Sequence, residues 1–343
     1  MIIKELSSNK DELAWDEFVS STSNATFFHQ IGWKKLVEKC YKYKPIYLMA
    51  KEAGEINGIL PLFLVKNIFL GKRLISVPFA IAGGVCTNNT TATNILIDKA
   101  IELTKNFGCI YLELRNLEEE NFDNLVKKGN YFNFRVRLNS DHQTLWKGLR
   151  PTNRRYIRKA QRNNLDIILH SKEFQQFYHV YSRGQRNLGT PIQAYEWLEN
   201  LFFEFPDNHS IAMAIYNGKT VAAFLVRYFK NTVTYIFGYS LEEYRRLYPN
   251  YILIWELCQH ACRNGYEWFD LGRSVKSSGT YFFKEGWSAK PVQLNYQYYL
   301  NKPINIPDTS QENPRRRLFS KIWKTLPVPL ANTLGPVIRR RYP

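Results

Sequence analysis

Apolar and polar positions alternate in two similar parts of the chain, and each part begins with a hairpin pattern. Residues 45–65 (PIYLMAKEAGEINGILPLFLV) contain two β-rich runs around a Gly-containing turn. Residues 210–229 (SIAMAIYNGKTVAAFLVRYF) repeat this pattern around Asn217-Gly218, a dipeptide that favours a two-residue hairpin turn. We therefore expect a β-hairpin at each place.

The elements that follow the two hairpins also keep the same order. After the first hairpin come short apolar runs, a helical pattern near residues 92–107 and a strand-like run at 109–115. After the second come a strand-like run at 232–240, a helical pattern near 250–264 and a strand-like run at 267–273. The repeat is roughly 160 residues long, far longer than a solenoid repeat. The sequence thus predicts an α/β (α+β) fold of two tandem lobes, each a mixed, mostly antiparallel sheet flanked by helices.

Helix signals place the junction between the two lobes. A helix begins near Asp141, and a basic linking helix over 151–164 follows a break. Pro151 suits the first turn of this second helix, where its missing N–H costs nothing. Three parts are therefore expected: an N-terminal lobe at 1–140, a C-terminal lobe at 141–300 and a basic Pro-containing tail at 301–343.

Composition supports a globular, cytoplasmic protein. The 343 residues are 45% hydrophobic and 15% aromatic, enough to build a sizeable core. No run of about 18 apolar residues is present, so no membrane-spanning helix is expected. The five cysteines form no CxxC pair, and the charged N-terminus lacks the apolar core of a signal peptide.

One group of residues resembles a metal site in type but not in spacing. Cys258, His260 and Cys262 lie close together in the sequence, but positions 258 and 262 belong to a helical pattern with no second ligand pair nearby. We therefore expect buried structural thiols and no metal.

Positive charge is concentrated in two segments. The chain has 47 Lys and Arg residues against 30 Asp and Glu residues, a net charge of +17. Residues 147–162 contribute +7 and residues 313–343 contribute +8, and neither segment contains an acidic residue. Such local basicity indicates anionic partners at particular surfaces.

The first basic segment places its arginines on one side of a helix. Arg154, Arg158 and Arg162 recur every four positions and therefore share a face. Two interpretations remain open. The row is either a solvated basic face or an anion-facing surface in the cleft between the lobes.

The second basic segment mixes apolar residues with cations. Within the tail, RRRLFSKIWKTLPVPLANTLGPVIRRR combines large apolar side chains with Lys and Arg. Segments of this kind bind at the surface of anionic membranes. The alternatives are a tail packed on the protein body with its cations exposed, and a nucleic-acid contact. An anionic membrane surface is thus one candidate partner of residues 313–343, and the protein would then be peripheral on the inner face of the cell membrane.

Several stretches in both halves of the chain carry a family likeness. In the second half they are LRPTNRRYIRKAQRNNL and the long block EYRRLYPNYILIWELCQHACRNGYEWFDLGRSVKSSGTYFFKEGW. In the first half they are FFHQIGWKKLVEK, ILPLFLVK, FAIAGGVCTNN and CIYLELRN. These stretches resemble the FemAB-like (BioF2-like) group of the GNAT acyltransferase superfamily, the relatives of peptidoglycan-bridge aminoacyltransferases. The likeness covers about residues 1–300, and the stretch from Gly-Arg-Ser to Phe-Lys-x-x-Trp is its most specific part.

The resemblance implies two GNAT-like lobes and an N-acyltransferase or aminoacyltransferase activity. The donor would be an acyl thioester (acyl-CoA) or an aminoacyl-tRNA, used as a co-substrate with no tightly bound cofactor. The acceptor would be an amino group of a sugar or peptide in cell-envelope or polysaccharide biosynthesis: an amino-sugar, a sugar-nucleotide or a lipid-linked glycan. In this family Arg154 corresponds to an arginine that meets the acceptor's phosphates, and Lys284 corresponds to a lysine that lines the transfer site.

Two departures from the family pattern concern phosphate binding. The family's early phosphate-binding lysine is not evident, because Val37 stands four residues after Trp33. Where ordinary GNAT enzymes carry a glycine-rich loop for the CoA pyrophosphate, this chain has Tyr248-Pro249, and proline has no N–H to donate. Gly83-Gly84 in the first lobe is a weak alternative.

The block FDLGRSVKSSGTYFFKEGW (269–287) is the predicted floor of the active site, because cationic and hydroxyl groups follow the end of a strand. Acyl transfer needs a placed carbonyl, a route for the amine proton and stabilisation of the oxyanion. We expect Lys284 to steady charge, and Asp270 to orient or deprotonate the acceptor, with Glu113 as its first-lobe counterpart. The alternative for these acids is structural pairing with Arg273 and Arg115. The candidate catalytic residues are Lys284, Asp270 and Tyr281, and the candidate substrate-binding residues are Arg154, Arg158, Arg273, Ser274, Ser278, Gly279, Thr280, Trp33 and Tyr239.

Other functional classes remain open at this point. The alternative to a transferase is a catalytically inactive protein, either one that binds nucleic acid such as tRNA or a membrane-peripheral scaffold. The basic segments contain no recognised RNA-binding motif.

Overall fold

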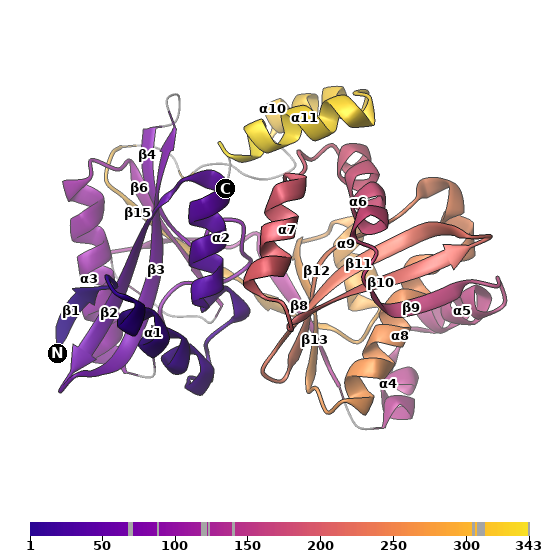
Figure 1. Cartoon of the computed structure of the whole chain (residues 1–343), viewed down its shortest axis with the longest axis horizontal. Helices are drawn as coiled ribbons and strands as arrows, with labels where there is room; N and C mark the ends of the chain where they lie inside the picture. The colour runs from indigo at the N-terminus through magenta and orange to yellow at the C-terminus, as the bar shows by residue number, and fades with distance from the viewer. Residues whose placement is uncertain are drawn as a thin grey trace.

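The computed structural model describes residues 1–67, 71–87, 89–117, 122, 124–138, 141–303, 306 and 313–341. Its strands form two mixed, mostly antiparallel sheets, one in each lobe (Figure 1), which confirms the predicted fold class. The first sheet has the order β1 (Ile2–Glu5), β2 (Lys44–Glu52), β3 (Glu55–Asn67), β4 (Gly71–Ser76), β6 (Tyr111–Asn116), β15 (Asn295–Leu300) and β7 (Val126–Lys128), with β5 (Cys86–Thr87) paired to β3. The second has the order β14 (Lys290–Gln293), β8 (Tyr131–Arg137), β13 (Trp268–Val275), β12 (Thr232–Ser240), β11 (Lys219–Phe229), β10 (His209–Tyr216) and β9 (Asp166–Ser171).

Both predicted hairpins are confirmed. Ala53-Gly54 joins β2 to β3, and Asn217-Gly218 joins β10 to β11. Both residues of each turn have positive φ, 50° and 91° in the first turn and 48° and 73° in the second. This backbone conformation is typical of two-residue turns that match the twist of antiparallel strands.

The two sheets exchange strands across the boundary expected at residue 140. β8 precedes that boundary but pairs with β13 and β14 of the second lobe. β15 lies in the second half of the chain but pairs with β6 and β7 of the first lobe. The expected spans 1–140 and 141–300 therefore do not coincide with the sheets, because each sheet takes one strand from the other span.

The helices lie on the outer face of each sheet and in a layer between the sheets (Figure 1). α3 (Thr90–Asn106) packs on the outer face of the first sheet. Outside the second sheet lie α4 (His142–Gly148), α5 (Pro151–Gln161) and α8 (Pro249–Arg263). The layer between the sheets contains α1 (Asn9–Ser21), α2 (Ile31–Tyr41), α6 (Phe174–Leu188) and α7 (Tyr195–Glu204).

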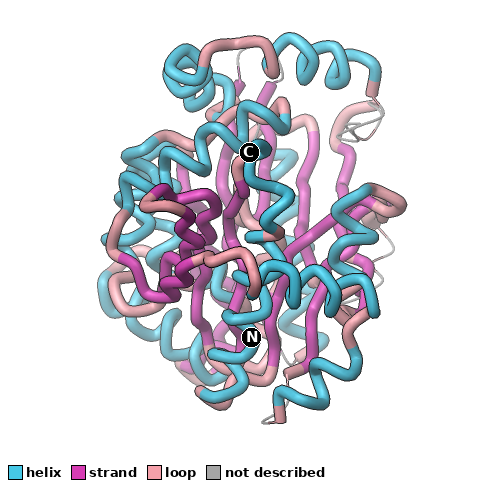
Figure 2. Tube along the Cα trace, turned by 90° about the vertical axis from the view of Figure 1, so that its right-hand side faces the viewer, coloured by secondary structure: helices cyan, strands magenta, loops and turns pink. Residues whose placement is uncertain are grey.

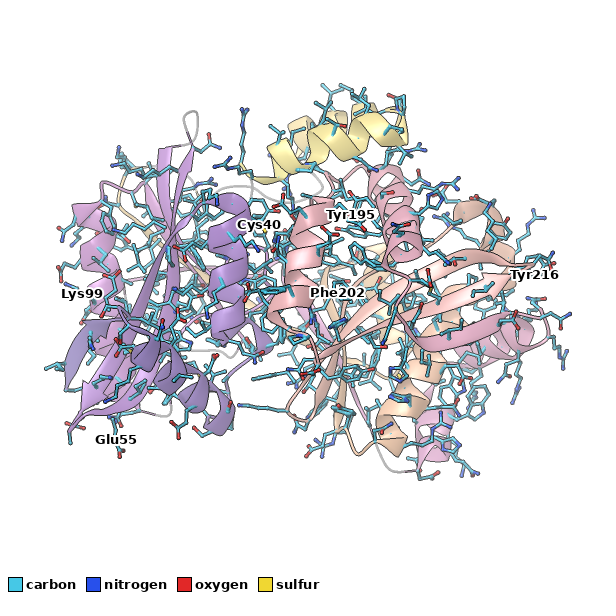
Figure 3. All side chains as sticks on the ribbon, viewed as in Figure 1. Cys40, Glu55, Lys99, Tyr195, Phe202 and Tyr216 are labelled. Carbon is cyan, nitrogen blue, oxygen red and sulfur yellow. The ribbon has the colours of Figure 1, made fainter. Side chains whose placement is uncertain are left out.

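A single hydrophobic core joins the two lobes through this middle layer. Trp33 of α2 and Trp197 of α7 are both 1% exposed, and their ring centroids are 5.9 Å apart. Figure 3 shows the side chains that fill the space between these two helices, with Cys40 on α2 and Phe202 on α7. The lobes therefore share a packed interface.

The tail forms two further helices, α10 (Pro314–Trp323) and α11 (Val328–Arg339), along one outer edge of the molecule (Figure 1, Figure 2). Trp323 and Ala331 are buried, and Gly335 packs closely against Ile192. After α11 the chain reaches the first lobe, where Arg73 Nη2 donates to the carbonyl of Arg341 at 3.1 Å. Within the described residues, no helix combines the length and apolar character needed to cross a bilayer.

Candidate active site

The site begins where β13 departs from its neighbours. β13 pairs in parallel with β12 only from Trp268 to Asp270, and its register against β8 shifts between Asp270 and Arg273. Gly272 lies in this bulge with φ of 73°, a conformation that favours glycine. The bulge turns the backbone of β13 toward the helix that follows it.

That helix, α9 (Gly279–Glu285), presents Lys284 to the bulge. Ser278 caps its first turn by accepting a hydrogen bond from the N–H of Tyr281 at 3.2 Å. Lys284 Nζ donates to the carbonyls of Gly272 at 3.0 Å and Arg273 at 2.8 Å. Burial lowers the pKa of Lys284 from 10.5 to about 8, Asp270 opposes this shift, and Arg273 adds to it. The amine is thus held in place, and with a pKa of about 8 it loses its proton far more readily than an ordinary lysine.

Asp270 lies at the start of the same bulge. Its carboxylate accepts from Asn133 Nδ2 at 2.8 Å and from the N–H of Gly272 at 2.7 Å. Arg135 Nε lies 4.0 Å from Asp270 Oδ2. Burial raises the pKa of Asp270, and these hydrogen bonds and charges oppose the effect. Asp270 is therefore oriented by Asn133 and Gly272 rather than by the Arg273 that the structural alternative required.

The first lobe borders the site through the exchanged strand β15. Arg273 Nη1 donates to the hydroxyl of Tyr296 at 2.8 Å, and this hydroxyl donates to the carbonyl of Ile81 at 2.6 Å. A Cβ added to Gly272 would lie 3.3 Å from Ile81 Cδ1. The segment FAIAGGVCTNN of the first lobe therefore meets the GRS block of the second.

The remaining polar candidates of the block divide into exposed and buried groups. Gly279 and Thr280 are exposed at the start of α9, next to the Ser278 cap. Ser274 is buried, and its hydroxyl has no hydrogen-bond partner in the described part of the chain. Tyr281 packs edge-on against Phe134 of β8, with ring centroids 4.8 Å apart. Among these groups Ser278, Gly279 and Thr280 are open to solvent or partly so.

Two aromatic candidates lie away from this site. Trp33 is enclosed in the interlobe core and donates its indole N–H to the carbonyl of Pro78 at 3.2 Å. Tyr239 is 8% exposed, and its ring lies directly against Gly184 of α6. This corrects the expectation that Trp33 and Tyr239 line the acceptor cleft, because both rings are covered by packing.

The arginine row also differs in position from the anion-facing interpretation. α5 packs on α8 at the outer end of the second lobe rather than between the lobes (Figure 1). Arg154 donates to the carbonyl of Lys147 at 3.1 Å, and the guanidinium of Arg158 lies 5.4 Å from the ring centroid of Trp146. The row is thus a mostly solvated face, although the N-terminus of α5 reaches α9 through an ion pair between Arg150 and Glu285.

Glu113, the first-lobe counterpart of Asp270, forms an internal ion pair with Arg115. Arg115 Nε lies 2.8 Å from Glu113 Oε1, and both side chains are at most 10% exposed. Arg115 also donates to the carbonyls of Val77 and Ala80. Glu113 therefore has the structural pairing that the sequence left as an alternative, and the acidic residues 118–120 after this strand lie outside the described residues.

The two places considered for a CoA pyrophosphate offer few free backbone donors. Residues 242–247 form a 3-10 helix, and the N–H groups of Tyr244 and Tyr248 donate to the carbonyls of Leu241 and Arg245. α8 then begins with Pro249. In the first lobe, the Gly83 N–H donates to the carbonyl of Arg115, and both glycines are buried. These segments do not fit the usual backbone cradle for a pyrophosphate.

The cysteines of α8 lie in the second-lobe core. Cys258 and Cys262 are at most 5% exposed, and burial raises the pKa of Cys258. Among the described residues, no three His, Cys, Asp or Glu side chains are grouped to hold a metal ion.

Comparison with known proteins connects this geometry to an enzyme class. Residues 147–285 match the family model of an acetyltransferase (GNAT) domain, and this span contains both Asp270 and Lys284. The protein is an acyltransferase of the GNAT fold. Comparison of this acyltransferase with curated protein sequences gave no match.

Solved structures extend the likeness of this GNAT-fold acyltransferase to both lobes. FemX superposes with a TM-score of 0.68 at 13% identity, covering 88% of this chain and 97% of FemX. The C-terminal domain of a putative lysylphosphatidylglycerol synthetase from Agrobacterium fabrum gives 0.59 at 15% identity, covering 86% and 93%. A tandem GNAT protein from the clavulanic acid biosynthesis pathway gives 0.54 at 9% identity, covering 89% and 99%. The resemblance to the FemAB-like group is thereby confirmed at the level of the fold.

Proposed function

We propose that this protein transfers an acyl or aminoacyl group to an amino group of a sugar or peptide in cell-envelope or polysaccharide biosynthesis. The observation that carries the proposal is the placement of Lys284. Its amine is fixed by two backbone carbonyls near the partly buried carboxylate of Asp270, and its pKa is about 8. A group that gives and takes protons near neutral pH suits general acid–base catalysis.

The hydrogen bonds of Lys284 suit a general base. An ammonium group has three N–H donors, and the carbonyls of Gly272 and Arg273 use two of them. After loss of the third proton, the two remaining N–H groups keep these bonds, and the lone pair points in the third direction. Lys284 can therefore accept a proton without reorienting.

In the proposed reaction the acceptor nitrogen attacks the carbonyl carbon of the donor. A C–N bond forms, and the C–S bond of a thioester or the C–O bond of an aminoacyl ester breaks. The proton lost by the amine passes to Nζ of Lys284, which then returns a proton to the leaving thiolate or alkoxide. Asp270 orients the acceptor amine. The partly exposed Ser278 and the exposed Gly279 and Thr280, together with Arg273 and Tyr281, position the acceptor.

The donor is proposed to be an acyl thioester or an aminoacyl-tRNA. Because residues 242–249 and Gly83-Gly84 do not form a pyrophosphate cradle, the donor would be held through other contacts. The basic face of Arg154 and Arg158 has the charge that binding of a tRNA backbone requires. One structural neighbour is a domain of a putative synthetase of lysylphosphatidylglycerol, an aminoacylated lipid. This supports aminoacyl transfer without identifying the donor.

The acceptor is proposed to be an amino-sugar, a sugar-nucleotide or a lipid-linked glycan. Arg154 and Arg273 are the candidates for its phosphates. The same proposal places the protein in the cytoplasm, at the inner face of the membrane where such an acceptor is assembled.

The test is to incubate the protein with a panel of acyl-CoAs and aminoacyl-tRNAs and with amino-sugar acceptors, and to detect acylated product by intact mass. We expect a product with at least one donor class. Salt-sensitive binding to arbitrary RNA, with no product from any combination, would instead support a nucleic-acid-binding protein. The panel also separates the two donor classes directly.

A further inference from the structure

The two tail helices have an inner side that is fixed to the protein. Trp323 of α10 is 3% exposed, and Gly335 of α11 lies against the backbone of Ile192. Arg186 of α6 donates to the carbonyl of Lys324 at 3.1 Å. These contacts of Trp323, Lys324 and Gly335 therefore hold α10 and α11 against the rest of the protein in a defined orientation.

The same helices also expose large apolar side chains. On α11 the exposed large apolar residues are Leu330, Leu334 and Val337. They are spaced by four and three positions and therefore share one face of the helix. Leu318 and Ile322 of α10 are 61% and 57% exposed. The complete set of large apolar residues exposed on the two helices is Leu318, Phe319, Ile322, Leu330, Leu334 and Val337.

The same segment also contains cations and no acids. Residues 313–343 contain eight Lys and Arg residues and no Asp or Glu. Among those whose side chains the structure describes, the exposed cations are Arg316, Arg317, Lys321, Lys324, Arg340 and Arg341. A protein partner with a purely apolar face would leave these charges unmatched, whereas an anionic lipid surface matches both features.

We propose that α10 and α11 dock the protein on an anionic lipid bilayer. The helices lie in the plane of the surface, with Leu318, Ile322, Leu330, Leu334 and Val337 in the headgroup region and the Lys and Arg side chains on the lipid phosphates. In this arrangement no helix of the described residues crosses the bilayer. This docking surface is independent of the transfer reaction, because its residues belong to none of the elements that carry Lys284 and Asp270.

The test is co-sedimentation of the full-length protein with vesicles of phosphatidylcholine alone and of phosphatidylcholine mixed with phosphatidylglycerol at about 7 to 3. We expect binding to the mixed vesicles that weakens as salt is raised, and little binding to the neutral ones. Removal of the whole tail is unsuitable, because it would uncover the surface that Trp323 and Ala331 cover. Point substitutions on the exposed side avoid this problem.

Two double variants separate the apolar and charged contributions. Leu318→Ser with Ile322→Ser is expected to weaken vesicle binding roughly tenfold or more, since two apolar side chains no longer insert. Lys321→Gln with Lys324→Gln is expected to weaken it by a similar factor on anionic vesicles only. The matched control is Leu13→Ser on α1, because Leu13 is 74% exposed and α1 lies along the edge of the molecule opposite the tail helices (Figure 1).

Three results would overturn the proposal. One is equal binding to neutral and anionic vesicles that neither double variant changes. Another is RNA binding that the charge variant weakens and the apolar variant leaves intact, which would make the surface a nucleic-acid site. The third is a dimer in sedimentation velocity that Leu318→Ser with Ile322→Ser dissociates, since a second copy would then cover the face.

Discussion

The pKa of Lys284 gives a prediction whose magnitude follows from the structure. With a pKa of about 8, Lys284 is neutral in roughly 9% of molecules at pH 7, whereas an ordinary lysine with a pKa of 10.5 is neutral in roughly 0.03%. Burial thus increases the neutral form roughly 300-fold. If neutral Lys284 is the base, kcat/KM should rise about tenfold per pH unit below pH 8 and level off above it.

Two substitutions distinguish a base from a fixed charge. Lys284→Met removes the amine at similar volume, and Lys284→Arg keeps a positive charge that is not lost at any working pH. Both should lower kcat by about 10²–10⁴-fold and abolish the rise near pH 8. The control is Lys276→Met, because Lys276 is an exposed lysine in the loop between β13 and α9.

The assay combines pH–rate profiles with an NMR titration of lysine side chains labelled with ¹³C. The signal lost in Lys284→Met should titrate near pH 8. The pH dependence of the free energy of unfolding tests the same lowered pKa of Lys284. Between pH 8 and 10.5 the unfolded chain binds the Lys284 proton and the folded chain does not, so stability should rise with pH relative to Lys284→Met. A flat rate profile, or full activity in Lys284→Arg, would refute the role of Lys284 as a base.

Three further substitutions, with Gly218→Ala as a control, test the surroundings of the site. Gly272→Ala and Gly218→Ala should each lower the free energy of unfolding in urea by about 1–2 kcal/mol, because both residues have φ of 73°. Only Gly272→Ala should also lower activity. Equal activity in the two variants would contradict the site geometry. Asn133→Ala should raise the pKa of Asp270 further and cost about 1–3 kcal/mol, so an unchanged acidic limb of the pH–rate profile would count against it. Trp33→Ala should cost about 3–5 kcal/mol of stability with KM unchanged in the folded fraction, and a higher KM without loss of stability would restore Trp33 to the acceptor site.

Local sequence signals predicted the elements that short-range chemistry determines. The Asn217-Gly218 turn and the alternation of residues 210–229 specify a hairpin without help from the rest of the chain. Pro151 likewise begins α5 as its lack of an N–H predicts. The polar loop after β13 was also recognisable, because Gly and Ser are typical turn residues and here they end the apolar run of the strand.

Long-range pairing was not predictable from these signals. Nothing in residues 131–137 or 295–300 indicates which sheet each strand joins, since strand pairing depends on partners distant in the sequence. Tyr296 of the exchanged β15 and Asn133 of β8 were therefore missed as parts of the site. The alternation of Asn133, Arg135 and Arg137 is the one signal that polar groups share a face of β8.

Trp33 and Tyr239 are buried, which differs from the expectation that they line the acceptor cleft. Trp33 belongs to the family-like segment FFHQIGWKKLVEK, but its neighbours Phe27, Phe28 and Trp197 enclose it. Aromatic side chains bury large areas, so a core role outweighs ligand contact unless a polar group or a cavity lies beside the ring. A sequence pattern alone does not reveal which case applies.

The central claim is that Lys284 acts as the general base in acyl transfer to an amine. The most direct measurement is the mass of the acceptor after incubation with a donor and with wild-type, Lys284→Met or Lys276→Met protein, each first shown to be folded by circular dichroism. We predict the mass increase of one acyl or aminoacyl group with wild type and Lys276→Met, and its loss with Lys284→Met. Undiminished product formation by folded Lys284→Met would contradict the claim.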